Sequence, residues 1–63
     1  MNFKENLKSL RIKKDYTQEE LAKQLNLNYR TYLSYEHGER EPRYSTLEEL
    51  THILECDYND LLK

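Results

Sequence analysis

The sequence has little of the material from which β-sheets, disulfides and membrane spans are built. Its 63 residues include one glycine, one proline and no tryptophan, so few of the turns that strands require are available. The single cysteine, Cys56, excludes an internal disulfide, and no apolar run approaches the roughly 20 residues of a membrane span. We therefore expect one all-α domain over residues 1–63, in the cytoplasm and without membrane contact.

The charge pattern bears on what the protein can bind. A net charge of −2 argues against nucleic acid as a partner, because DNA-binding modules are usually basic. The distribution weakens this objection: residues 1–43 hold nine Lys/Arg and seven Asp/Glu, whereas residues 44–63 hold one and five. The N-terminal part of the chain, residues 1–43, is thus mildly basic, and the C-terminal part, residues 44–63, which we call the acidic back, is acidic. An anionic partner is therefore not excluded.

The central stretch YTQEELAKQLNLNYRTYLSYEHG, residues 16–38, predicts two short helices separated by a tight turn. Thr17 followed by Glu20 has the spacing of a capping box, which begins the first helix. Asn28 can cap the second, and Gly38 supplies the left-handed residue that ends it. Two helices joined by so short a turn must cross steeply, as in helix-turn-helix units.

The second of these helices has an inner and an outer face. At 100° per residue Tyr32 and Tyr35 point inward, and Tyr16 is also expected in the core. The outer face carries Tyr29, Arg30, Leu33, Ser34 and His37. This mixture of side chains is typical of a surface that contacts a partner, although an ordinary exposed arginine is the simpler interpretation of Arg30 taken alone.

Three further helices are predicted around the central pair. An apolar residue at every third or fourth position predicts a helix over residues 2–14. Ser45 followed by Glu48 has capping-box spacing and predicts a helix that begins after Ser45, and Asp57 can cap a last turn or two. The residues before three of the caps stand at hydrophobic-staple positions: Tyr16, Leu27 and Cys56.

With TQEELA at 17–22, YEHG at 35–38 and REP at 40–42, the sequence resembles the helix-turn-helix domains of lambdoid phage repressors and Cro-like proteins, the XRE family. The resemblance covers nearly the whole chain. It implies a five-helix lambda-repressor-like fold whose second and third helices form the helix-turn-helix. It also implies sequence-specific binding of double-stranded DNA, with the third helix in the major groove. We expect a stand-alone transcriptional regulator of the repressor or Cro type, since a chain of 63 residues has no room for a ligand or catalytic domain.

The resemblance also assigns roles to individual positions. Tyr29, Arg30 and Ser34 match base-reading positions, and Tyr29 and Leu33 can pack on a thymine methyl group. The positions that match phosphate contacts are Thr17, Gln18, His37, Arg40 and Arg43. Arg11 and Glu36 match an ion pair that joins the first and third helices. Three residues depart from the family pattern: Asn26 replaces a turn glycine, Tyr32 an aliphatic residue, and Leu33 a small one.

We expect the protein to act as a homodimer on an inverted-repeat operator, because one module of this size offers too little surface for tight specific binding. The expected dimer contact consists of apolar residues near the C-terminal end: Leu54, Tyr58, Leu61 and Leu62.

An alternative function is that of a DNA-binding antitoxin or interaction module whose acidic back binds a partner protein. Retardation of operator DNA by the protein alone distinguishes the two. Catalysis is not expected, since the sequence has no Gly-rich phosphate loop and no nucleophile with a base and a pocket. His52 and Cys56 lie four residues apart, but two ligands without a second pair do not make a metal site. No metal, cofactor or small-molecule ligand is expected.

Overall fold

The computed structural model describes residues 2–63, so the predicted domain 1–63 includes one residue, Met1, that lies outside the described part. The helices are α1 (Phe3–Lys13), α2 (Gln18–Gln24), α3 (Tyr29–Glu36), α4 (Tyr44–Ile53) and α5 (Tyr58–Leu62). The expected all-α, five-helix fold is confirmed over these residues. No helix in this range is long and apolar enough to cross a membrane.

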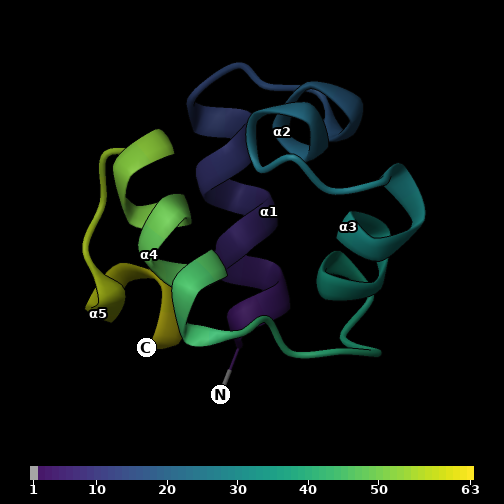
Figure 1. Ribbon diagram of the computed structural model, residues 1–63. Helices are drawn as coiled ribbons and strands as arrows, with labels where there is room; N and C mark the ends of the chain where they lie inside the picture. Colours follow the sequence, from purple (N-terminus) through teal and green to yellow (C-terminus); the bar gives the residue numbers. More distant parts are fainter. Residues whose placement is uncertain (1) are drawn as a thin grey trace.

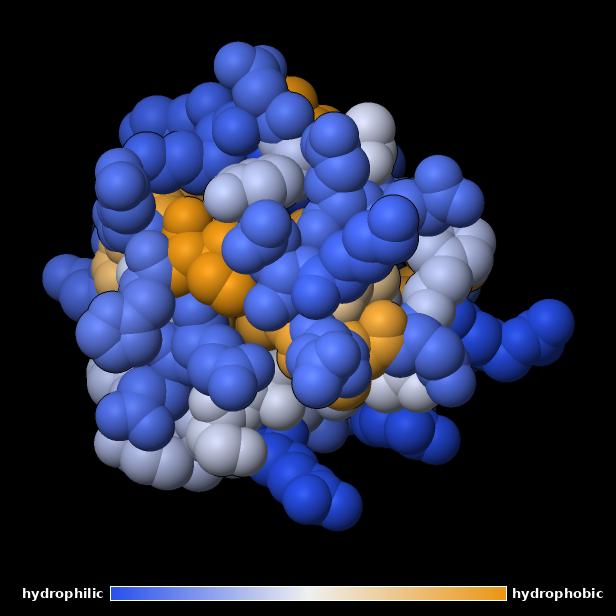
Figure 2. Space-filling model, turned by 45° about the horizontal axis from the view of Figure 1, so that its top comes forward, coloured by the Kyte–Doolittle hydropathy of each residue, from blue (hydrophilic) through white to orange (hydrophobic). Residues whose placement is uncertain are grey.

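Helix α1 runs through the middle of the molecule, with α2 and α3 on one side and α4 and α5 on the other (Figure 1). The fully buried leucines come from four of the five helices or their ends: Leu7, Leu21, Leu50, Leu54 and Leu61. Burying each such side chain contributes about 1.5–3 kcal/mol. On the face drawn in Figure 2, most of the hydrophobic surface lies near the centre, among hydrophilic residues that cover the larger part of this face.

Three connections between helices share one three-residue pattern. The first residue has a positive φ: Asp15 (63°), Asn26 (60°) and Glu55 (52°). The second packs against the core: Tyr16, Leu27 and Cys56. The third caps the next helix: Thr17, Asn28 and Asp57. Each αL residue and its successor bond back to carbonyls of the preceding helix, as Leu27 N–H does to Ala22 O at 2.9 Å, which satisfies the helix end in a Schellman motif.

The start of α4 differs from the expectation. The helix begins at Tyr44 after Arg43, which makes no side-chain capping bond, so the prediction of a capping box at Ser45 and Glu48 is wrong. Tyr44 stacks on Tyr58 of α5, with ring centroids 5.7 Å apart and planes 20° apart. This contact between helices favours including Tyr44 in the first turn, and a rule based on local spacing does not register it.

The expected dimer contact also requires correction. Leu54 and Leu61 are 1% and 0% exposed, so two of its four residues belong to the core and offer nothing to a partner. Helix α5 packs against α1, and Asn6 Nδ2 donates to the Leu61 carbonyl at 2.9 Å, which holds this short helix in place. Tyr58 and Leu62 remain partly exposed.

Candidate nucleic-acid interface

Helix α3 presents opposite faces to the core and to solvent. Asn28 begins it by accepting a hydrogen bond on Oδ1 from the Thr31 N–H at 2.8 Å. On the inner face Tyr32 and Tyr35 are buried, with their rings edge to face at a centroid distance of 6.5 Å. The outer face has a shallow hollow of about 290 Å³, lined by Tyr29, Arg30, Leu33, Ser34, His37 and Glu39. All four residues expected to read bases therefore share one surface with His37.

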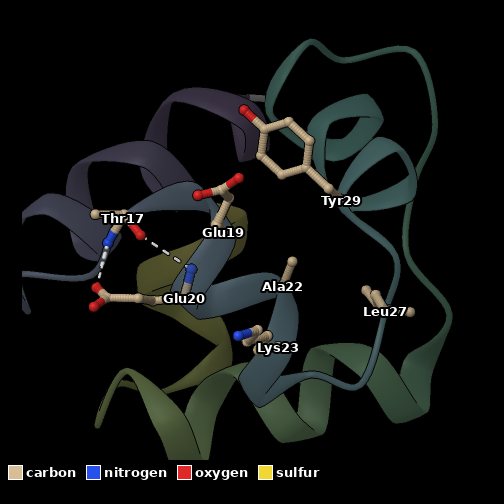
Figure 3. Close-up of a pocket in the computed structure, with 7 residues that line it drawn as sticks. All are labelled: Thr17, Glu19, Glu20, Ala22, Lys23, Leu27 and Tyr29. Carbon is tan, nitrogen blue, oxygen red and sulfur yellow. Dashed lines mark hydrogen bonds between the residues drawn. The ribbon is translucent and has the colours of Figure 1, made fainter.

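The first turn of α2 lies beside this surface. The Thr17 hydroxyl accepts from the Glu20 N–H at 3.0 Å, and the Thr17 N–H donates to the Glu20 carboxylate at 2.9 Å, so the predicted capping box is present (Figure 3). A second hollow of about 490 Å³ is lined by Thr17, Glu19, Glu20, Ala22, Lys23, Leu27 and Tyr29. The Glu19 carboxylate points toward the Tyr29 side chain (Figure 3). Two carboxylates here weaken the attraction of this helix end for an anion.

The Glu36 carboxylate accepts hydrogen bonds from side chains of α1, α2 and α3. Arg11 Nε donates to its Oε2 at 2.6 Å and Arg11 Nη2 to its Oε1 at 3.4 Å, so the predicted ion pair is present. Gln18 Nε2 donates to Oε1 at 3.0 Å, and the Tyr32 hydroxyl donates to Oε2. Arg11 Nη1 also donates to the Tyr16 carbonyl at 2.9 Å. The side chain of Glu36 is 2% exposed, so its charge is removed from water and is held by donors from three helices.

These contacts determine the protonation states. Burial by itself would raise the pKa of Glu36, but hydrogen bonds from Arg11, Tyr32 and Gln18 hold that pKa below its ordinary range. Burial and the hydrogen bond to Glu36 raise the pKa of the Tyr32 hydroxyl. Burial would lower the pKa of Arg11, yet its hydrogen bonds and charge interaction with Glu36 raise it. At neutral pH Glu36 is therefore an acceptor only, and Tyr32 keeps its proton.

The loop after α3 carries the remaining expected phosphate contacts, Arg40 and Arg43, both exposed. Gly38 has a φ of 76°, as expected for the residue that ends α3. The Arg40 N–H donates to the Ser34 carbonyl at 3.3 Å, which ties the start of this loop to the reading helix. Arg40 and Lys4 line a common hollow of about 210 Å³ together with Glu41, so Lys4 adds a positive charge and Glu41 a negative one beside Arg40.

A family model described as helix-turn-helix matches residues 7–61. The chain belongs to this helix-turn-helix family. The resemblance noted from the sequence is thereby confirmed, and α2 and α3, with the αL residue Asn26 between them, form the helix-turn-helix unit.

Named relatives are similar over most of this chain. The uncharacterized HTH-type transcriptional regulator YqaE of Bacillus subtilis (strain 168) is 43% identical over 61 residues, which are 97% of this chain and 53% of YqaE. The cryptic phage CTXphi transcriptional repressor RstR of Vibrio cholerae is 38% identical over 48 residues, 76% of this chain and 43% of RstR.

The SPbeta prophage-derived uncharacterized HTH-type transcriptional regulator YonR of Bacillus subtilis (strain 168) is 39% identical over 61 residues, 97% of this chain and 56% of YonR. The chain therefore spans about half the length of the curated relatives it matches. No solved structure matches it at a significant level.

Two contacts inside the helix-turn-helix do not follow from the sequence patterns. Tyr32, which departs from the family's aliphatic residue, places a hydroxyl on Glu36. Gln18, expected at a phosphate, has both ends of its side-chain amide engaged, because Nε2 donates to Glu36 and Oε1 accepts from the Tyr29 hydroxyl at 3.2 Å. Gln18 thus connects the reading surface to the buried carboxylate. The signal available in the sequence was only that Gln18 follows the capping residue of α2.

Proposed function

We propose that the chain is the DNA-binding part of a transcriptional regulator, which reads double-stranded DNA sequence-specifically with α3 in the major groove. The observation that carries this proposal is the outer face of α3, where four side chains of different chemistry share one hollow. The inner face of the same helix is anchored by Glu36 to two other helices. Such anchoring suits sequence readout, since side chains must meet base edges in a constant register.

Family membership and the names of the relatives, one of them a transcriptional repressor, support a regulator of the repressor or Cro type. Bacterial DNA lies in the cytoplasm, and the relatives come from bacteria and their phages, so we expect the protein to act there.

The proposed contacts are of two kinds, to base edges and to phosphates. Arg30 can donate two hydrogen bonds to guanine O6 and N7, and Leu33 can pack on a thymine methyl group. The Ser34 hydroxyl donates its hydrogen to the Thr31 carbonyl at 2.6 Å, so toward a base it can accept a hydrogen bond. The proposed phosphate contacts are Thr17, Gln18, His37, Arg40 and Arg43, of which the two arginines lie exposed in the loop after α3.

Selection of binding sites from random duplex DNA tests this function. We expect the purified protein to enrich one sequence and to retard it in a gel. Arg30→Ala should cost about 1–3 kcal/mol on that sequence and relax base preference at one position. Arg43→Ala is the matched control, because loss of a phosphate contact should weaken all sequences alike and lower the salt slope by about 1. Equal losses on selected and random DNA for Arg30→Ala would show that α3 is not the reader.

We further propose that two copies bind an inverted repeat with half-sites about 34–36 Å apart. With Leu54 and Leu61 in the core, the dimer contact is revised to the stacked pair Tyr44 and Tyr58 with Leu62. Tyr44 is 68% exposed although it is a large aromatic residue. Exposed acidic residues surround this end of the chain: Glu55, Asp57 and Asp60. Salt should therefore tighten dimerisation by screening their repulsion, while it weakens DNA binding.

Sedimentation at micromolar concentration measures this association. Tyr44→Glu should give a monomer with an unchanged helical signal, because the side chain is exposed and an acidic residue suits the first turn of a helix. Ile12→Glu is the matched control, since Ile12 is 55% exposed at the end of α1, on another part of the surface. A wild-type protein that stays monomeric and binds a single half-site with full affinity would rule out the dimer.

A further inference from the structure

The hydroxyl of Tyr29 is the end of a hydrogen-bonded chain that begins at a buried carboxylate. Tyr29 is 44% exposed at the first position of α3, and its ring extends toward the start of α2 (Figure 3). Its hydroxyl lies 3.2 Å from Gln18 Oε1, and Gln18 Nε2 lies 3.0 Å from Glu36 Oε1. The exposed reading residue is therefore connected through one amide to the centre of the ion-pair network.

The direction of every hydrogen bond in this chain follows from its buried end. An ionised carboxylate has no hydrogen and can only accept, so the Gln18 atom facing Glu36 must be the amide nitrogen. Glu36 stays ionised because Arg11 and two further donors face it. The Gln18 oxygen consequently faces Tyr29, and an amide oxygen can only accept. The single hydroxyl hydrogen of Tyr29 is thus directed inward, which leaves only lone pairs on the side that is open to a partner.

We infer that Tyr29 acts in the proposed DNA complex as a hydrogen-bond acceptor and selects a base pair by its major-groove amino group, adenine N6 or cytosine N4. These amino groups are the donors that base pairs present in that groove, whereas thymine O4 and guanine O6 are acceptors. An acceptor facing another acceptor forms no hydrogen bond and leaves both groups unpaired. This inference rests on the proposed function and adds to it the chemical group that Tyr29 recognises.

Because every base pair carries one amino group and one keto group in the major groove, the bases selected do not by themselves reveal which group is read. Deleting single groups from the selected site separates them. The position to alter is the one at which Tyr29→Phe loses base preference in a selection experiment. Purine in place of adenine, or pyrimidin-2-one in place of cytosine, removes the amino group. Analogues of thymine or guanine without the keto oxygen remove the acceptor.

We expect amino deletion to weaken the wild-type protein by roughly three- to tenfold more than it weakens Tyr29→Phe, the range for one neutral hydrogen bond. Keto deletion should weaken both proteins equally. Gln18→Leu removes the acceptor of the Tyr29 hydroxyl hydrogen, so that hydrogen becomes free to bond a keto group. In that variant the amino deletion should cost less affinity than in the wild type, and the keto deletion should cost more. Gln24→Leu is the matched control, because Gln24 is exposed at the far end of the same helix, and it should respond as the wild type does.

A Tyr29-dependent loss that follows the keto deletion would overturn the inference, as would a Gln18→Leu variant with the wild-type pattern. Enrichment of a DNA sequence with no position that depends on Tyr29 would also overturn it and leave the proposed function standing. Failure to enrich any sequence would instead refute the proposed function, and this inference with it.

Discussion

Replacing Arg11 by methionine tests whether the buried ion pair holds the helix-turn-helix on α1. Methionine keeps much of the length of the side chain and removes its charge and all its hydrogen bonds. In the wild type those bonds reach the Glu36 carboxylate at 2.6 and 3.4 Å and the Tyr16 carbonyl at 2.9 Å. The variant therefore leaves a carboxylate with 2% side-chain exposure without its cation.

The expected loss follows from what remains around that carboxylate. Breaking a buried ion pair by removing one partner costs about 3–5 kcal/mol. Gln18 and Tyr32 still donate to Glu36 in the variant, which places the loss at the lower end, about 3 kcal/mol. Tyr32→Phe removes one of these donors and leaves the pair, so it should cost about 1–2 kcal/mol. Total stability of a domain this small is on the order of 5 kcal/mol, so Arg11→Met should be only marginally folded.

Urea unfolding followed by circular dichroism measures the loss. Lys14→Met is the matched control, because it removes a cation from the end of the same helix and breaks the exposed Lys14–Glu55 pair, whose side chains are 35% and 74% exposed. We expect no change in its urea midpoint beyond experimental error. If Arg11→Met shifts the midpoint no further than Lys14→Met does, the ion pair does not hold the helices together and the reasoning is refuted.

The pH dependence gives a second check. The pKa of Glu36 is lowered in the folded protein, so its ionisation stabilises the fold at pH values above the ordinary glutamate pKa of about 4.3. That contribution is lost as the pH falls through the lowered pKa and the carboxylate takes up a proton. The difference in stability between the wild type and Arg11→Met should therefore be full at neutral pH and should shrink in acid below pH of about 4.

Other substitutions test the fold. Leu61→Ala should cost about 2–5 kcal/mol in urea unfolding, and Leu61→Glu should abolish folding, because the side chain is 0% exposed; a folded Leu61→Glu protein would contradict the described core. Gly38→Ala should cost about 1 kcal/mol, chiefly through the φ of 76°, since the new Cβ meets only the flexible Lys4 side chain at 2.9 Å; an unchanged melting temperature would argue against the left-handed conformation. Thr17→Ala removes the capping box of α2 and should cost about 1 kcal/mol, whereas Thr17→Ser should cost little.

Local signals were sufficient for most helix boundaries. Capping residues act within three or four positions of the chain, so Thr17, Asn28 and Asp57 could be assigned from spacing alone, and each accepts the expected hydrogen bond. The turn at Asn26 was predictable for the same reason, because tolerance of a positive φ is a property of the residue itself. The capping-box rule failed at Ser45, where α4 begins one residue earlier and its first residue, Tyr44, stacks on Tyr58 of α5.

The site residues also include some that the sequence predicted and some that depend on how the helices pack. Helical periodicity predicted which side chains of α3 lie outside, and the family resemblance supplied the partners Arg11 and Glu36, 25 residues apart. Neither source revealed that Gln18 bridges Glu36 and Tyr29, since both hydrogen bonds depend on how α2 is set against α3. The hydrogen bond from the Tyr32 hydroxyl to the Glu36 carboxylate was not predicted either, because it depends on how the core is packed.

The sequence by itself determined most helix boundaries, though not the start of α4, and which face of α3 is presented, because capping, turn conformation and helical periodicity act between neighbours in the chain. Only the tertiary structure decided which apolar side chains are buried in the core of the domain and which stay exposed. Leu54 at the end of α4 and Leu61 in α5 look available to a partner as long as each helix is considered alone, and both are buried once the helices pack together. Burial depends on every element that surrounds a residue, and spacing along one helix carries no information about the others.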